Sequence, residues 1–97
     1  MVLITRQHGE IIIEGHAGYA PHGQDIVCAG VSTLTQGFIE AVEQLTTDKL
    51  KTHITAGKAI IRYKELSKDA QLLLSSFFIG LKMIANEYPN NVKLTEP

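Results

Sequence analysis

At the start of the chain, the pattern of hydrophobic and polar positions is typical of a β-hairpin. Residues 1–7 and 10–16 are rich in β-branched side chains and flank a tight turn. After them, three glycines and Pro21 between residues 15 and 23 exclude regular structure. The pattern therefore predicts two strands followed by an irregular loop.

A helical period follows this loop. Asp25 is a favourable N-cap residue, and behind it hydrophobic residues recur every three or four positions. The spacing predicts a helix with one buried stripe. The residues of that stripe are Val27, Val31, Leu34, Phe38, Ala41 and Leu45.

The pattern then returns to that of a hairpin. Residues 50–56 and 59–65 alternate between hydrophobic and polar around the turn Gly57-Lys58. The residues expected to contribute to the core here are Ile54, Ile60 and Ile61. This segment predicts a third and a fourth strand.

A second helical stripe follows Ser67, which we expect to be its N-cap, and a short last strand is predicted at 92–95. The stripe consists of Ala70, Leu74, Phe77, Leu81, Ile84 and Tyr88. This helix carries more apolar residues than one contact with a sheet needs, so we expect a homodimer through the surplus. The surplus residues are Leu72, Leu73, Phe78, Ile79 and Met83.

The elements have the order β-β-α-β-β-α-β. This order predicts an α/β fold, a two-layer sandwich in which two helices cover a mixed or antiparallel sheet. A length of 97 residues is that of one domain, so residues 1–97 are expected to form a single domain.

Composition and charge narrow the possible functions. With 44% hydrophobic residues and 20% charged residues, the chain has enough apolar material to fold. The nine Lys and Arg residues are scattered and the net charge is -1, which makes nucleic acid an unexpected direct partner. No basic segment precedes a long apolar stretch, so we expect neither a targeting segment nor a membrane span.

The single cysteine, Cys28, cannot form an internal disulfide, which is typical of a cytoplasmic protein. With Asp25 at the N-cap, Cys28 lies in the first helical turn. Unpaired backbone N–H groups and the helix dipole favour a thiolate there. The alternative is a cysteine buried as a small hydrophobic residue.

His16 ends the second predicted strand, and the following loop can fold back to bring its imidazole to the start of the helix. A Cys–His pair could then attack a carbonyl, with N–H groups of the helix start stabilising the oxyanion. Three other histidines compete for the role of base, namely His8, His22 and His53.

Other residues near the cysteine have candidate roles. Asp25 can cap the helix, orient His16, or do both. Ser32, one turn after Cys28, can donate a hydrogen bond to the site or to the backbone carbonyl four residues before it. We expect the loop of residues 17–24, with Gly18 and Gly23, to be mobile and to close over an extended peptide.

Two segments at a fixed spacing carry a resemblance to a known family. They are Gly15-His16-Ala17 and Gly23-x-Asp25-Ile26-Val27-Cys28-Ala29-Gly30-x-Ser32. Together they resemble the ribosomal-processing cysteine protease family, Prp. The segments 70–74 and 87–94 also resemble that family's second helix and last strand, so the likeness covers nearly the whole chain.

The resemblance implies an endopeptidase that removes a short N-terminal extension from bacterial ribosomal large-subunit protein twenty-seven. By matching positions, Cys28 would be the nucleophile, His16 the general base, and Asp25 and Ser32 supporting residues. The family also implies a homodimer and no cofactor, and His22 has no counterpart in its motif.

Two alternatives remain open from the sequence. One is a zinc site, because His16, His22 and Cys28 are spaced six residues apart and all three are possible ligands. The other is a noncatalytic peptide-binding or ribosome-assembly module that holds an extended segment at a strand edge. A reactive thiol would distinguish a protease from such a module.

Overall fold

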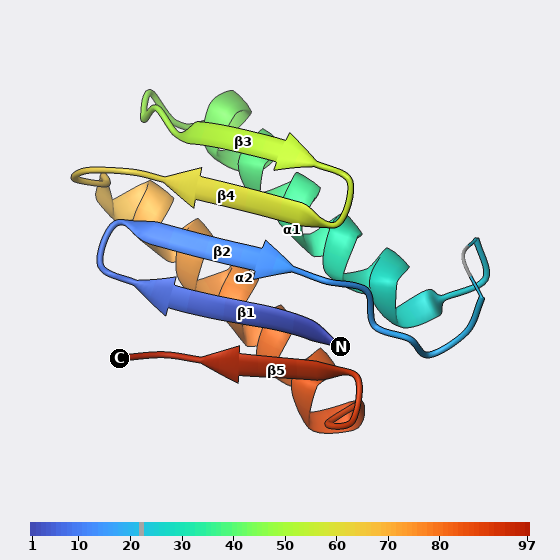
Figure 1. Cartoon of the computed structure of the whole chain (residues 1–97). Coiled ribbons are helices and arrows are strands. Elements are labelled where there is room, and N and C mark those ends of the chain that lie inside the picture. The colour runs from blue at the N-terminus through green and yellow to red at the C-terminus, as the bar shows by residue number, and fades with distance from the viewer. Residues whose placement is uncertain (22) are drawn as a thin grey trace.

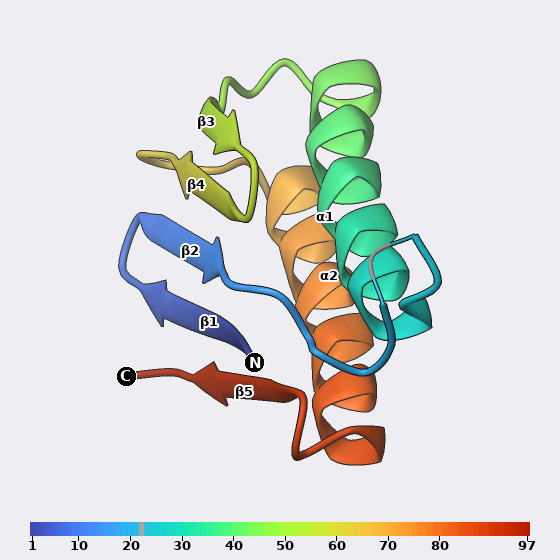
Figure 2. The ribbon, with the colours of Figure 1, turned by 45° about the vertical axis from the view of Figure 1, so that its right-hand side comes forward.

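The computed structural model describes residues 1–21 and 23–97, and its elements follow the predicted order. They are β1 (Val2–Gln7), β2 (Glu10–Glu14), α1 (Ile26–Leu45), β3 (Lys51–Thr55), β4 (Lys58–Arg62), α2 (Lys68–Glu87) and β5 (Val92–Thr95). The strands form one sheet (Figure 1), and both helices lie on the same face of it (Figure 2). The predicted two-layer α/β sandwich is confirmed.

The sheet is mixed. Its strand order is β3-β4-β2-β1-β5, and every neighbouring pair is antiparallel except β1 and β5, which run parallel from Val2 opposite Val92. Because of these directions, four features lie at one end of the sheet: the start of β1, the end of β2, the β3–β4 turn and the start of β5 (Figure 1). The start of α1 lies at the same end.

The two helices bury their stripes against the sheet and against each other. Phe38 of α1 and Phe77 of α2 stack with their ring centroids 4.8 Å apart. A Cβ atom on Gly30 would lie only 3.3 Å from the side chain of Ile84, so Gly30 allows α2 to approach α1 closely. Helix packing therefore accounts for a glycine inside α1.

Four predictions of burial were wrong or incomplete. Leu45, the last residue of α1, is 70% exposed, and Ile54 is 47% exposed because β3 is an edge strand whose five residues are all exposed. Thr35 is buried in the α1 stripe because its hydroxyl donates to the carbonyl of Val31 at 2.7 Å. Phe78, expected on the surface, is buried beneath the guanidinium of Arg6, which lies 4.2 Å from the ring centroid.

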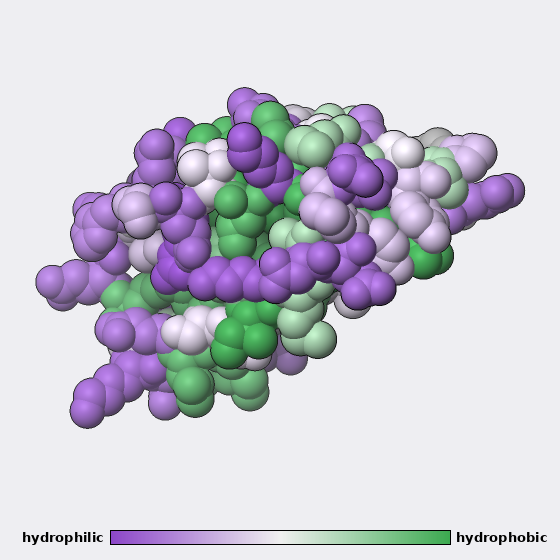
Figure 3. All heavy atoms as spheres, turned by 90° about the horizontal axis from the view of Figure 1, so that it is seen from below, coloured by the Kyte–Doolittle hydropathy of each residue, from purple (hydrophilic) through white to green (hydrophobic). Residues whose placement is uncertain are grey.

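Of the remaining surplus residues of α2, Leu73 is partly buried against the core and three are at the surface. Leu72, Ile79 and Met83 are all exposed. Apolar residues also reach the surface beside hydrophilic ones on the face of the molecule seen in Figure 3. Across residues 1–21 and 23–97, neither helix combines the length and the apolar character needed to cross a membrane.

Candidate active site

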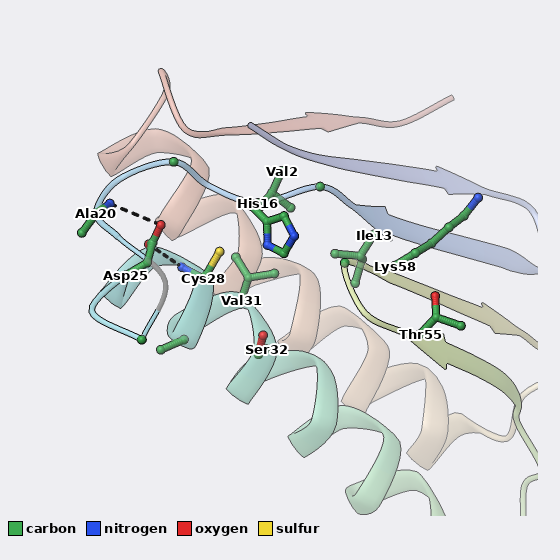
Figure 4. A pocket seen from close by; sticks show the side chains of 15 residues that line it. Val2, Ile13, His16, Ala20, Asp25, Cys28, Val31, Ser32, Thr55 and Lys58 are labelled. Atoms are coloured by element: carbon green, nitrogen blue, oxygen red, sulfur yellow. Dashed lines mark hydrogen bonds between the residues drawn. The ribbon is translucent and has the colours of Figure 1, made fainter.

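A pocket of ≈ 580 Å³ lies where β2 ends and α1 begins (Figure 4). Its walls come from the β2–α1 loop, the first turns of α1 and the β3–β4 turn, and its floor is apolar. The lining residues used below are His16, Gly18, Gly23, Asp25, Cys28, Ser32, Gly57 and Lys58. The structure thus brings the residues of both motif segments to one cavity.

Cys28 is the third residue of α1, and its thiol is free and half-buried. The backbone N–H of Ala17 donates a hydrogen bond to its sulfur, with the nitrogen 3.1 Å from Sγ. Ala17 itself is buried, and its carbonyl accepts a hydrogen bond from the side-chain amide of Asn91 at 3.0 Å. The sulfur therefore faces the pocket and is contacted by the segment that directly follows His16.

His16 lies just after β2, and Figure 4 shows its imidazole and the sulfur of Cys28 pointing toward one another. The imidazole packs on the β3–β4 turn: a Cβ atom on Gly57 would lie 3.2 Å from Nε2 of His16. The carbonyl of Gly57 also accepts a hydrogen bond from the N–H of Gly15 at 2.8 Å. This turn therefore helps to place the histidine.

Asp25 is the N-cap of α1, as predicted, and it also anchors the loop. Its Oδ1 accepts hydrogen bonds from the N–H groups of Val27 at 3.0 Å and Cys28 at 2.9 Å. Its Oδ2 accepts from those of Tyr19 at 3.0 Å and Ala20 at 3.4 Å. These bonds, that from Cys28 above all, lower the pKa of Asp25 below its usual range. Because the bonds that it accepts from described residues are all to backbone, it holds the loop to the helix.

Three N–H groups at the start of α1, where we expect oxyanion stabilisation, have partners in this structure. The N–H groups of Val27 and Cys28 are bonded to the Asp25 side chain, and that of Ala29 donates to the Asp25 carbonyl at 3.0 Å. These three donors are therefore bonded to Asp25, and the use of helix-start N–H groups for the oxyanion stays a prediction. The N–H of Ala17 is the backbone donor that the structure directs at the sulfur.

Three further predicted residues also line the pocket. Ser32 is exposed on α1, one turn after Cys28. Gly18 and Gly23 have φ angles of 69° and 88°, in the left-handed region that favours glycine. Among the residues that the structure describes, none comes within 4 Å of a Cβ atom at either glycine, so the backbone conformation and not space requires glycine there.

His22 lies outside the described residues, so the zinc alternative that included it stays a hypothesis. In the described part of the chain, no three His, Cys, Asp or Glu side chains gather closely enough to hold a metal ion. The geometry described above brings His16 and Cys28 together without reference to His22.

Comparison with known proteins decides the family. The family described as "Cysteine protease Prp" matches residues 2–93. The chain belongs to the cysteine protease Prp family. It is 34% identical over 88 residues to the ribosomal processing cysteine protease Prp of Staphylococcus aureus strain Mu50, covering 88% of this chain and 83% of that protein. The Prp of Bacillus subtilis strain 168 is 31% identical over 103 residues, covering 95% and 92%.

Solved Prp structures share the fold. A crystal structure of the essential Prp from S. aureus, in complex with a covalently linked product peptide, superposes with a TM-score of 0.90 at 31% identity, covering 99% of this chain and 97% of that one. A second structure of that protein, with a substrate peptide, has a TM-score of 0.82 at the same identity and coverage. Membership of the Prp family makes this chain a cysteine protease, so the noncatalytic module is set aside.

Sequence reasoning missed three groups at or next to this candidate site: the N–H of Ala17, Gly57 and Asn91. Gly57 was visible as a hairpin glycine, but the pairing of β2 with β4 that brings it to His16 was not. Asn91 gave no signal, because it lies 74 residues from the carbonyl that it contacts.

Proposed function

We propose that this protease removes the N-terminal extension of bacterial ribosomal large-subunit protein twenty-seven, with Cys28 as nucleophile and His16 as general base. The observation that carries the proposal is the position of the single cysteine. The chain belongs to a cysteine protease family, and its thiol lies in the pocket and faces the imidazole of His16. Residues 1–97 would act as one catalytic domain.

The reaction follows the usual course of covalent catalysis. His16 takes the proton of the thiol, and the thiolate attacks the scissile carbonyl carbon to form a tetrahedral intermediate. The imidazolium then protonates the leaving amine, which leaves a thioester between Cys28 and the substrate acyl group. A water molecule activated by His16 hydrolyses the thioester, which releases the new C-terminal carboxylate and restores the thiol. The covalently linked product peptide of the S. aureus protein supports this scheme.

The nature of the substrate rests on two supports. The relatives are named for ribosomal processing, and the S. aureus protein has been crystallised with substrate and product peptides. An open pocket of ≈ 580 Å³ leaves room for more than one residue of an extended chain. We place the activity in the cytoplasm, where ribosomal proteins are made.

The direct test is cleavage of a peptide that spans the extension junction, with mass spectrometry to locate the cut. We expect one defined cut by the wild type, and its loss in Cys28→Ser and in His16→Ala. His53→Ala is the matched control, because His53 is exposed on the edge strand β3 and should be dispensable. A wild type that does not cut the peptide, or a His16→Ala variant that cuts as fast as His53→Ala, would contradict the proposal.

The loop of residues 17–24 is proposed to close over the bound peptide, with Ser32 and Asp25 in supporting roles. Proline fixes φ near -65°, so Gly18→Pro and Gly23→Pro cannot keep the positive φ angles of these glycines. We expect both variants to lower kcat/KM for the junction peptide. Steady-state kinetics identical to the wild type in both would contradict a role for the loop.

A homodimer is proposed through α2. Leu72, Ile79 and Met83 expose 70%, 62% and 67% of their surface, and their spacing of seven and four residues places them on one side of the helix. We expect sedimentation of the wild type as a dimer and of Leu72→Glu/Ile79→Glu as a monomer. A monomeric wild type, or a double variant that still dimerises, would contradict this interface.

A further inference from the structure

The backbone on either side of Ala17 is held by two distant groups. Its N–H donates to the sulfur of Cys28, and its carbonyl accepts from Nδ2 of Asn91. The N–H and the carbonyl belong to consecutive peptide units, so the two bonds together fix the orientation of Ala17. Ala17 is also buried, so it has little freedom to turn in another way.

The backbone of Asn91 is fixed by bonds that do not involve its side chain. Its N–H donates to the carbonyl of Tyr88 at 3.0 Å, and its carbonyl accepts from the N–H of Val2 at 2.8 Å. Both bonds are made by the backbone and lie where β5 joins β1. The amide of Asn91 therefore extends from a rigid strand junction and does not need to be ordered by the loop.

We propose that Asn91 is a positioning residue that aims the N–H of Ala17 at the sulfur and so favours the thiolate form of Cys28. A hydrogen bond to a charged group stabilises that charge, and such bonds are stronger than those between neutral groups. This stabilisation requires the N–H of Ala17 to point at the sulfur. The hydrogen bond from Asn91 to the carbonyl of Ala17 keeps the N–H in that orientation. The inference rests on the proposed role of Cys28 as nucleophile.

Other charged groups at the pocket are left in place by a change at residue 91. His16, Asp25 and Lys58 line the pocket, and Lys58 is paired with Glu14 across β2 and β4 at 3.7 Å. The backbone bonds of residue 91 also remain in a variant that alters only its side chain. A difference between the variants below therefore reports on the side-chain amide.

The test compares Asn91→Ala and Asn91→Asp with Asn90→Ala, a control in the exposed neighbouring residue of the same turn. Iodoacetamide alkylation at pH 7 should slow about tenfold in Asn91→Ala, near the lower end of what a hydrogen bond to a charged group contributes. At pH 10, where an ordinary thiol is ionised, the rate should equal that of the wild type. Asn91→Asp should be slower still at pH 7, because its carboxylate repels the Ala17 carbonyl.

The rate of cleavage of the junction peptide should change in parallel with the rate of alkylation at pH 7. We expect kcat to be lowered in both Asn91 variants and KM to change little. Replacing Ala17 by its ester analogue removes the N–H and keeps the carbonyl that Asn91 contacts. This change should reproduce the slow alkylation of Asn91→Ala, and adding Asn91→Ala to it should have no further effect.

Alkylation at pH 7 that is equally fast in Asn91→Ala and Asn90→Ala would overturn the inference. So would a slowing that persists undiminished at pH 10, because that pattern indicates blocked access and not a lost thiolate. The proposed function fails differently: the wild type would then not cut the junction peptide, whatever the alkylation rates are.

Discussion

The two ends of the sheet are built from the same parts. At the site end, Gly57 closes the β3–β4 turn at a φ of 76°, and Asp25 holds the start of α1. At the opposite end, Gly9 closes the β1–β2 turn at a φ of 77°, and Asp48 holds the start of α2 through Ser67. A pocket that contains a cysteine and a histidine is found at the site end.

The difference lies in what each aspartate binds. The carboxylate of Asp48 accepts two hydrogen bonds from Ser67, one from its N–H at 2.8 Å and one from its hydroxyl at 2.6 Å. The hydroxyl oxygen of Ser67 in turn accepts a hydrogen bond from the N–H of Ala70 at 3.1 Å. These bonds join the start of α2 to the loop before β3, 19 residues earlier in the chain. Asp25 instead joins the helix start to a loop from which a histidine and an N–H group face the thiol. A structural cap becomes part of a site when it anchors a loop that carries reactive groups.

The largest effect is expected from the two hairpin glycines. Gly57→Ala would place a methyl group 3.2 Å from Nε2 of His16, so the imidazole of the proposed general base would have to move by a few tenths of an ångström. A misplacement of about 1 Å can cost about 100-fold in rate, so we expect kcat/KM to fall by more than about tenfold. In Gly9→Ala the methyl would instead meet the carbonyl of Tyr63 at 2.9 Å, so this variant should be the less stable of the two. Urea unfolding and kcat/KM for the junction peptide should rank the variants in opposite order. The same rank in both assays would contradict a role for the turn in placing His16.

The next largest effect on activity is expected at Asp25, and none is expected at Asp48. Asp25→Asn keeps an acceptor oxygen for the helix, but its amide group cannot accept from Tyr19 and Ala20. We expect kcat/KM to fall about tenfold as the loop is released. Asp48→Asn should leave kcat/KM unchanged once the fraction of folded protein is taken into account. Equal activity in both variants would show that the anchored loop is not needed.

A smaller effect is expected at the cap of α2. Ser67→Ala should lower the free energy of unfolding by about 1 kcal/mol, because the N–H of Ala70 and the Asp48 carboxylate both lose a partner. Ser75→Ala, an exposed change inside the same helix, should stay within about 0.5 kcal/mol of the wild type. Urea denaturation measures both, and kcat/KM should change in neither.

The smallest effect is that of acid on the two caps. The pKa of Asp25 is lowered chiefly by the Cys28 N–H, and that of Asp48 chiefly by the Ser67 hydroxyl. A lowered pKa in the folded state gives stability that is complete above the ordinary value of 3.8 and is lost as the pH falls through the lowered value. We expect the urea midpoint of Asp25→Asn/Asp48→Asn to fall less than that of the wild type between pH 6 and pH 2.5. Parallel curves would contradict the assignment.

The sequence predicted what depends on local spacing. Asp25 as N-cap and Cys28 in the first turn follow from short-range chemistry, and both were found. Thr35 was missed because its polar side chain breaks the apolar period, although a bond to the Val31 carbonyl satisfies its hydroxyl in the core. Ile54 was misplaced because alternation does not distinguish a central strand from an edge strand.

The parts of the site that the sequence did not reveal come from strand pairing. The β2–β4 pair brings Gly57 to His16, and the β1–β5 pair brings Asn91 to Ala17. The order of strands in a sheet depends on the packing of the whole chain, so no window of neighbouring residues encodes these contacts.

The parallel pairing of β1 with β5 has a consequence for synthesis of the protein. Translation proceeds from the N-terminus, so His16, Cys28, the loop between them and the β3–β4 turn all leave the ribosome before β5 does. Until β5 docks beside β1, Asn91 cannot reach the Ala17 carbonyl. An enzyme whose proposed substrate is a ribosomal protein would thus acquire its fully ordered site only after the last strand has emerged, which delays activity in the nascent chain.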